Sequence, residues 1–206
     1  DVQVKSTGGE EALTRITDGL VELQDGKLKI ASDNKFAQIK VRLAIPDKHY
    51  DVFVARLLNG SIAIEHLDAK LIKAKTFNGL IRLEHATFAH AELTSSNGAI
   101  EVRNVIGDDL ETETANGRVY IDGELKEVEA ESVNGHVVVT TTSKVAHKIK
   151  ARTIAGAVEI YVPKSLALEG QVFSNFGRAD VGLTDAVLHE EEEQFLVKSV
   201  RFTKEL

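Results

Sequence analysis

Seven acidic residues recur at regular intervals in the middle of the chain, and their types and spacing could support chemistry. Within each segment they alternate with uncharged residues, so in a β-strand they would share one solvent-facing side. Grouped carboxylates can act as acid and base, bind a metal ion or attract a cationic partner. The acidic series is Glu92, Asp109, Glu111, Glu113, Glu127, Glu129 and Glu131, and the basic residues that flank it are Lys73, Lys75, Lys150 and Arg152.

Catalysis by paired carboxylates, as in polysaccharide-cleaving β-helix enzymes, would require two of them beside a substrate cleft. Asp108, Asp109 and Asp122 are the candidates for such a pair. A cleft needs long loops from several repeats, and the repeat spacing of 18 or 19 residues in the centre of the chain leaves no room for them. Serine and threonine concentrate in a column that suits internal packing, which argues against a nucleophilic site. The sequence therefore predicts a non-enzymatic protein without catalytic residues.

A metal site is conceivable at His66 and His85, because each follows a glutamate and the two occupy the same position of adjacent repeats. The next repeat carries Arg103 and Asn104 there, and the arginine would oppose a bound cation. We therefore predict no metal and no cofactor. The run Glu190–Glu193 could attract calcium or a basic peptide, and we interpret it as a solvated charged loop.

The elements that position these residues follow from an internal repeat. A glycine returns every 18 to 21 residues, and asparagine precedes it in five of seven repeats, which indicates turns because both residues tolerate positive φ. Mostly apolar residues stand two and four positions after each glycine and five and seven positions before it, so two short strands flank the turn. Serine or threonine stands three positions before six of the glycines, where its hydroxyl can bond to turn backbone. The repeated glycines are Gly60, Gly79, Gly98, Gly117, Gly135, Gly156 and Gly177.

In successive repeats the same type of residue stands at the same position relative to the glycine. This regularity distinguishes stacked parallel coils from a meander of hairpins. An Asn-Gly pair between alternating strands is also a strong hairpin signal. Equivalent positions need not stack in a meander, whereas parallel coils about 4.8 Å apart place them directly beside one another. The sequence therefore predicts an all-β, single-domain parallel β-helix with coils of about nineteen residues. In this fold Ile100 contacts Val119, and Leu110 contacts Val128.

We expect a single β-solenoid domain over residues 1–206. Residues 39–177 form the regular coils, residues 1–38 an N-terminal cap and residues 178–206 a C-terminal cap. The ends depart from the repeat because an uncovered sheet edge would pair with other chains.

The composition is typical of a folded, soluble domain, with 43% hydrophobic and 28% charged residues. No apolar run approaches the roughly 18 residues of a membrane-spanning helix, so we expect no transmembrane segment in the chain. The formal net charge of −7 argues against nucleic acid as a partner and favours a basic ligand. Cysteine is absent, which excludes disulfides and thiolate metal sites.

The Asn-Gly repeats with their alternating apolar residues, together with the corners Ile45-Pro46 and Val162-Pro163, resemble a bacterial adhesin family of β-strand-repeat proteins. The resemblance covers roughly residues 39–183. Within that family the chain looks most like the C-terminal domain of LiaX-type proteins of Gram-positive cocci, which are linked to envelope stress and the daptomycin response. The resemblance implies a module at the bacterial cell surface, or outside the cell, that restrains a membrane-bound stress-signalling system, with antimicrobial peptides or daptomycin sensed by the complete protein.

The acidic series and the resemblance predict a non-enzymatic interaction or regulatory module. Its partner would be a protein or a cationic peptide, including a basic loop of a membrane-bound signalling component, and not a nucleic acid. The acidic series would be the contact surface. The flanking basic residues would set the register of the partner, because they would repel any basic part of it that extends beyond the acidic series. A structural adhesin-like surface scaffold is the alternative, and a glycan-active enzyme is the least favoured one.

Overall fold

The computed structural model describes residues 47–143, 148–163 and 168–181, together with six further strands. Those strands are β1 (Val2–Ser6), β2 (Val21–Gln24), β3 (Lys27–Ile30), β4 (Ile39–Leu43), β17 (Val187–Gln194) and β18 (Val197–Lys204). All regular elements of the described residues are β-strands. The described part of the chain contains no helix with the length and apolar character needed to cross a bilayer.

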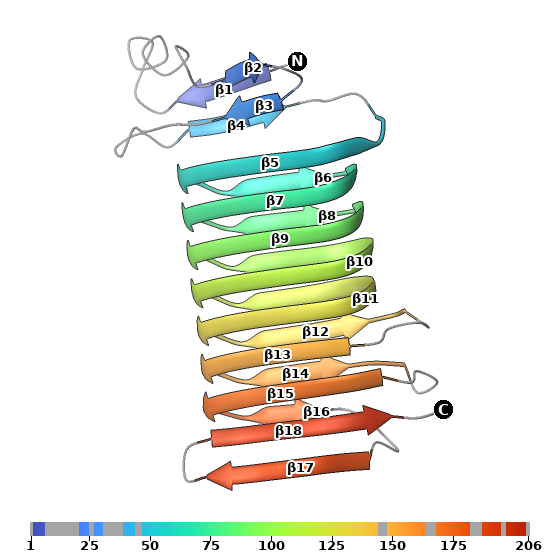
Figure 1. Ribbon diagram of the computed structural model, residues 1–206. Coiled ribbons are helices and arrows are strands. Elements are labelled where there is room, and N and C mark those ends of the chain that lie inside the picture. The colour runs from blue at the N-terminus through green and yellow to red at the C-terminus, as the bar shows by residue number, and fades with distance from the viewer. Residues whose placement is uncertain are drawn as a thin grey trace.

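The central strands form a parallel stack of coils with two faces (Figure 1). The first face comprises β5 (Tyr50–Asn59), β7 (Asp68–Asn78), β9 (Thr87–Asn97), the later residues of β10 (Ile100–Asn116) and β11 (Val119–Asn134), β13 (Lys148–Ala155) and β15 (Leu168–Phe176). The second face comprises β6 (Ile62–Glu65), β8 (Ile81–Glu84), the earlier residues of β10 and β11, β12 (Val137–Thr141), β14 (Val158–Tyr161) and β16 (Ala179–Val181). Neighbouring coils pair in parallel, so the predicted β-helix is confirmed and the meander is excluded.

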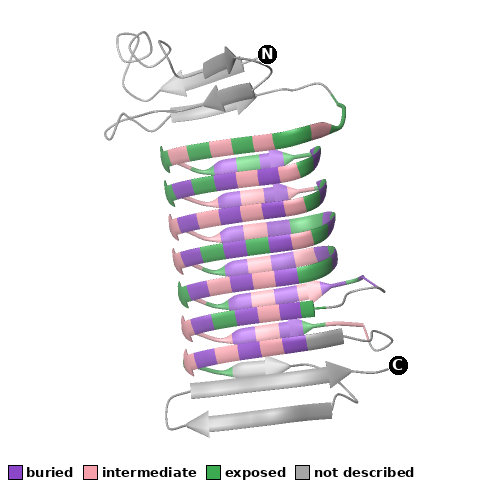
Figure 2. Cartoon of the chain, viewed as in Figure 1, coloured by how far each residue is buried: buried purple, intermediate pink, exposed green. Residues whose placement is uncertain are grey.

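Equivalent residues of successive coils lie in register, as the repeat predicted. Ile100 pairs with Val119, and Leu110 pairs with Val128. Burial alternates along the strands, which places every second side chain in a shared core (Figure 2). Because each aliphatic side chain packs on its equivalents in the coils beside it, no coil has a complete core of its own. The largest fully buried side chains are Ile72, Ile81, Leu83, Leu93, Ile100, Leu110, Ile121, Leu125, Ile149 and Ile160.

A corner after the second-face strand explains one irregular repeat. His66, His85 and Asn104 occupy this corner with φ of 54°, 53° and 51°. Histidine and asparagine are among the non-glycine residues that adopt this left-handed conformation most readily. The next coil has no such residue, since Val105 pairs directly with Gly123. Loss of the corner residue accounts for the spacing of 18 rather than 19 between Gly117 and Gly135.

Contacts between coils, more than positive φ, explain the Asn-Gly turns. Each asparagine amide donates to the amide oxygen of the asparagine one coil earlier, at 2.7–2.9 Å, from Asn78 to Asn134. None of these asparagines has positive φ, so their tolerance of a left-handed backbone is not used in these turns. A Cβ at Gly98 would overlap the carbonyl oxygen of Gly79. Glycine is required there because neighbouring turns approach too closely for any side chain.

The predicted hydroxyl column is confirmed. Six buried hydroxyls each donate to the carbonyl oxygen of the glycine one coil earlier, at 2.9–3.0 Å. These bonds satisfy carbonyl groups that would otherwise be buried without a donor. The donors are Thr76, Ser95, Thr114, Ser132, Thr153 and Ser174.

The two ends differ from the regular coils. Residues 39–43, which were predicted to open the regular coils, form β4 and pair antiparallel with β1 in a separate two-stranded sheet. The first Asn-Gly turn of the repeat is Asn59-Gly60, so these residues precede the turns that allow close stacking. At the other end β15 pairs antiparallel with β18, and β18 with β17. Glu190–Glu193, predicted as a loop, lies within β17. The division into caps and coils otherwise remains a prediction.

Candidate functional site

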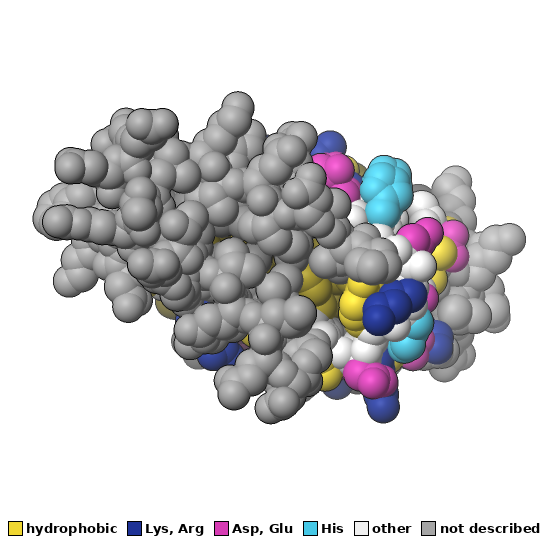
Figure 3. Space-filling model, turned by 90° about the horizontal axis from the view of Figure 1, so that it is seen from above, with side chains coloured by type: hydrophobic (Ala, Val, Ile, Leu, Met, Phe, Trp, Pro, Cys, Tyr) yellow, Lys and Arg dark blue, Asp and Glu magenta, His cyan; other side chains and the backbone are white. Residues whose placement is uncertain are grey.

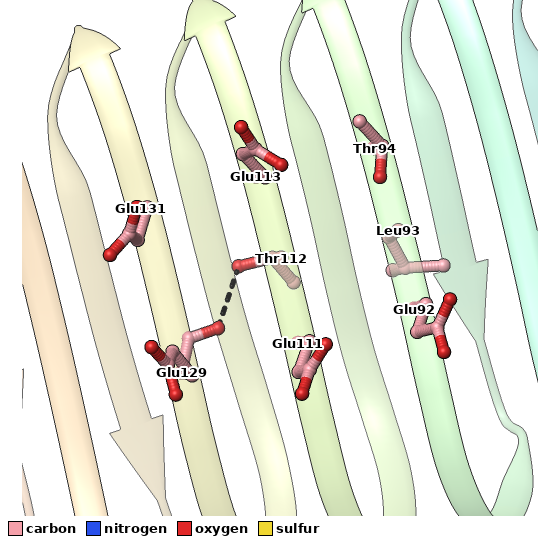
Figure 4. A pocket seen from close by; sticks show the side chains of 8 residues that line it. All are labelled: Glu92, Leu93, Thr94, Glu111, Thr112, Glu113, Glu129 and Glu131. Atoms are coloured by element: carbon pink, nitrogen blue, oxygen red, sulfur yellow. Dashed lines mark hydrogen bonds between the residues drawn. The ribbon is translucent and has the colours of Figure 1, made fainter.

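An open depression of about 390 Å³ lies on the first face, across β9, β10 and β11. Two rows of side chains border it, with Leu93 and Thr112 between them (Figure 4). One row is Glu92, Glu111 and Glu129, and the other is Thr94, Glu113 and Glu131. We call the surface formed by these eight residues the acidic depression.

Parallel register and strand alternation build the acidic depression. Glu111 is paired in register with Glu92 on one side and with Glu129 on the other, and Glu113 is paired with Glu131. The residues that alternate with them, such as Leu110 and Thr112, are buried. Five residues of the predicted acidic series therefore border one surface. Asp109 lies beside it, and Glu127 is exposed outside the depression.

Lysines at the two ends neutralise the outer glutamates. Lys73 Nζ lies 2.6 Å from Glu92 Oε1, and Lys150 Nζ lies 3.4 Å from Glu129 Oε2. This ion pairing differs from the predicted role of the lysines, which was to repel the part of a basic partner that extends beyond the acidic series. The two other flanking residues are not paired with the depression: the guanidinium of Arg152 lies 4.9 Å from the centre of the Phe173 ring, and the Lys75 side chain is exposed.

Three carboxylates remain uncompensated. Glu111, Glu113 and Glu131 have no ion pair with any described residue. Glu111 and Glu113 are exposed, and Glu131 is half-buried. Like charges directly opposite on neighbouring strands are destabilising. The centre of the depression therefore carries excess negative charge that a cationic group would neutralise.

His90 lies at the edge of the depression and contacts two carboxylates. Its Nδ1 lies 2.8 Å from Asp109 Oδ2, and its Nε2 lies 3.1 Å from Glu92 Oε1. Burial lowers the pKa of His90, but the hydrogen bonds to Glu92 and Asp109 outweigh it, and the pKa is raised above 6.5. The pKa of Glu92 is lowered, mainly by the hydrogen bond from Lys73 and further by that from His90.

Sequence analysis missed His90, although a signal was present. His90 stands eight positions before Gly98, and Asp109 stands eight positions before Gly117, so the two occupy one column. His90, Glu92 and Glu111 offer potential metal-ligand atoms that lie within 4.8 Å of one another.

The residues that sequence analysis weighed as metal ligands or catalytic acids are arranged differently. His66 and His85 stack with ring centroids 5.1 Å apart at the left-handed corner, and they are not part of the ligand group found among the described residues. Asp108 pairs with Lys126, whereas Asp122 belongs to the second face, away from Asp109. The candidate carboxylate pair is thus not assembled around a cleft.

Charges elsewhere on the described surface are mixed in sign. Glu101 on the second face is only 13% exposed and contacts Arg82, Arg103 and Arg118. In a view along the stack, acidic, basic and histidine side chains are interspersed on the visible part of the described surface (Figure 3). The acidic depression differs from this pattern because Glu111, Glu113 and Glu131 form no ion pair with a described residue.

Comparison with known proteins identifies a family and a curated relative. A family model described as Toastrack DUF4097 matches residues 21–200. The chain is 45% identical over 182 residues to a protein of Bacillus subtilis (strain 168) described as "Uncharacterized protein YvlB". The match covers 88% of this chain and 50% of that protein, so the chain spans about half the length of this curated relative. No solved structure matches the chain.

Proposed function

The chain belongs to the Toastrack DUF4097 family, and on this premise we propose that it is a non-enzymatic β-solenoid module whose acidic depression binds a basic segment of a protein or peptide. The observation that supports this most directly is the set of uncompensated carboxylates at Glu111, Glu113 and Glu131. A partner that supplies positive charge would relieve their mutual repulsion and gain charge-assisted hydrogen bonds.

The spacing of the carboxylates suits arginine and lysine side chains. Glu113 and Glu131 are in register on adjacent strands, which lie about 4.8 Å apart, so one planar guanidinium can bridge the two carboxylates. Glu111 and Glu113 are two residues apart on one strand, a separation of about 6.8 Å. An extended peptide with basic residues at alternate positions has the same period and would place a second cation at Glu111.

The construction of the depression supports binding rather than catalysis. Its lining residues come from three parallel strands, and no described loop projects over them. A shallow surface of this kind leaves a bound group accessible to water, whereas catalytic sites gain much of their effect by excluding it.

The resemblance to LiaX-type proteins supports a more specific proposal. The module would act at the bacterial cell surface, and its partner would be a cationic antimicrobial peptide or a basic segment of a membrane-bound stress-signalling protein. Restraint of that signalling system would be relieved when the depression is occupied by a competing cation.

A structural scaffold is the second candidate. The asparagine ladder and the hydroxyl column cross-link every described turn from Gly60 to Gly135, which would suit a rigid spacer. A scaffold requires no ligand at the depression, so a binding experiment separates the two functions.

The test is the binding of a fluorescent alternating arginine-serine peptide to the full chain in EDTA, measured by anisotropy. The test variant is Glu111→Lys, Glu113→Lys and Glu131→Lys, and the matched control is Glu65→Lys, Glu124→Lys and Glu159→Lys. Each Glu→Lys change adds two positive charges, so both variants move the formal net charge from −7 to −1.

We expect the wild-type chain and the control to bind with affinities that fall with added salt, and the test variant to bind about tenfold more weakly or worse. A peptide with the same composition but with its arginines in one block should bind less tightly than the alternating one. Equal affinities of both folded variants would contradict the proposal and favour the scaffold.

A further inference from the structure

We propose that His90, Glu92 and Glu111 form a binding site for a divalent transition-metal ion such as Zn²⁺ at the edge of the acidic depression. The side chains of this chain supply all three ligands, so the site does not depend on the proposed partner. Imidazole nitrogen and carboxylate oxygen are both zinc ligands, and three protein ligands with an open fourth position for water are typical of catalytic zinc sites.

The ligand atoms already have distances that suit coordination. His90 Nε2 lies 3.1 Å from Glu92 Oε1, and all three residues offer atoms within 4.8 Å of one another. Two atoms bound to one tetrahedral zinc ion at about 2.0–2.2 Å each lie about 3.3–3.6 Å apart. The imidazole and Glu92 therefore need little movement, and the exposed side chain of Glu111 can rotate towards them.

Asp109 orients the imidazole for this role. With its proton on Nδ1, His90 donates to Asp109 Oδ2 at 2.8 Å, and the lone pair of Nε2 is then directed towards Glu92 Oε1. Two acceptor atoms at 3.1 Å repel each other unless a cation, either a proton or a metal ion, lies between them. A carboxylate behind a histidine ligand is the usual second-sphere arrangement at zinc sites.

Two cations compete with the metal. One is the proton on Nε2, and the other is Lys73, whose Nζ lies 2.6 Å from the same Glu92 oxygen. Glu111 has no ion pair with a described residue, so its charge is available to the metal. Removal of Lys73 should therefore strengthen metal binding, whereas removal of a ligand should weaken it.

This inference departs from the expectation of no metal, which considered only His66 and His85. Those two histidines are exposed and stack on each other at a corner of the coil. They provide a matched control, because adventitious binding to surface histidines would use them at least as readily as His90.

The test is the titration of the metal-free full chain with Co²⁺ and Zn²⁺ near neutral pH, without any partner. We expect one saturable site with the visible absorption of tetrahedral cobalt, displaced by zinc. His90→Ala and Glu111→Gln should abolish that absorption, Asp109→Asn should weaken binding about 10- to 100-fold, and Lys73→Gln should tighten it. The double variant His66→Ala and His85→Ala should bind as the wild type does.

Absence of saturable binding, or binding that survives His90→Ala in a folded protein, would overturn the site. Binding lost only in the His66 and His85 variant would show adventitious histidine coordination and would also overturn it. Tighter binding by Lys73→Gln cannot result from misfolding. This variant therefore tests the site even if the variants that remove a ligand also lose their structure. The peptide experiment is performed in EDTA, and failure of either proposal therefore leaves the other standing.

Discussion

At the scale of single residues, the character of the acidic depression depends on which carboxylates have a cation beside them. Glu92 and Glu129 stand in the same row as Glu111, yet only the two outer residues have a lysine partner. The difference comes from position in the stack, because the basic coils begin one strand beyond each outer glutamate. The charge without a lysine partner in this row therefore lies at the central residue, where we propose that a ligand binds.

His90 should make the stability of the metal-free protein depend on pH. Its pKa in the folded state is raised above 6.5, so the folded state holds the proton more tightly than the unfolded state does. The resulting stabilisation is fully present below pH 6.5 and is lost as the pH rises through the raised pKa. We expect His90→Gln to lower the melting temperature more at about pH 5.5 than at about pH 9.

Thermal unfolding of both proteins in EDTA measures this effect. His85→Gln is the control, since the His85 ring is exposed and contacts another histidine rather than a carboxylate. An equal loss of melting temperature for His90→Gln at both pH values would mean that His90 contributes packing only.

At the scale of elements, the turns impose the strictest requirement. Every coil must approach its neighbours at the spacing of paired strands, and a Cβ added at a turn glycine from Gly79 to Gly177 would overlap the carbonyl oxygen of the glycine one coil earlier. The hydroxyl column, three positions before the glycines, and the asparagine column, one position before five of them, hold the turns in register through hydrogen bonds from coil to coil.

Gly98→Ala should destabilise the domain. Its new Cβ would overlap the carbonyl oxygen of Gly79, a backbone atom that cannot move without shifting the whole turn. Overpacking of this kind costs about 1–3 kcal/mol. Chemical denaturation should show this loss, whereas Ser96→Ala near the end of β9, which removes an atom instead of adding one, should change stability little. Unchanged stability of Gly98→Ala would indicate that neighbouring turns can separate.

At the scale of the whole molecule, stability is shared because every coil completes the core of its neighbours. Ile100 is fully buried between Ile81 and Val119, which lie in the coils on either side. A defect in a central coil therefore exposes two interfaces, whereas a defect at an end exposes only one.

Ile100→Asp should prevent folding of the central coils. The carboxylate would be buried in an aliphatic ladder without a partner, which costs several kcal/mol, a large share of the stability of an ordinary domain. Far-UV circular dichroism and thermal unfolding measure the effect. Ala89→Asp adds the same charge at an exposed position of the preceding coil and should leave the fold intact. A cooperative transition near the wild-type temperature for Ile100→Asp would contradict the shared core.

The sequence alone determined the parallel fold, the inward columns and the outward acidic series. A repeat fixes these features because residues at one offset must stack when coils are in register, and strand alternation then assigns each column to the core or to solvent. The hydroxyl column could be predicted for the same reason, and His90 could have been placed beside Asp109 by its offset.

Only the tertiary structure decided which charged groups meet. Offsets order residues along a column, but the pairing of Lys73 with Glu92, and of His90 with both Glu92 and Asp109, depends on side-chain conformations across coils and along the strand. The left-handed corner at His66 and His85, and the antiparallel strands at both ends, likewise depend on local backbone geometry that departs from the repeat. Periodicity carries no information about such departures, because it describes what the coils share and not where one of them differs.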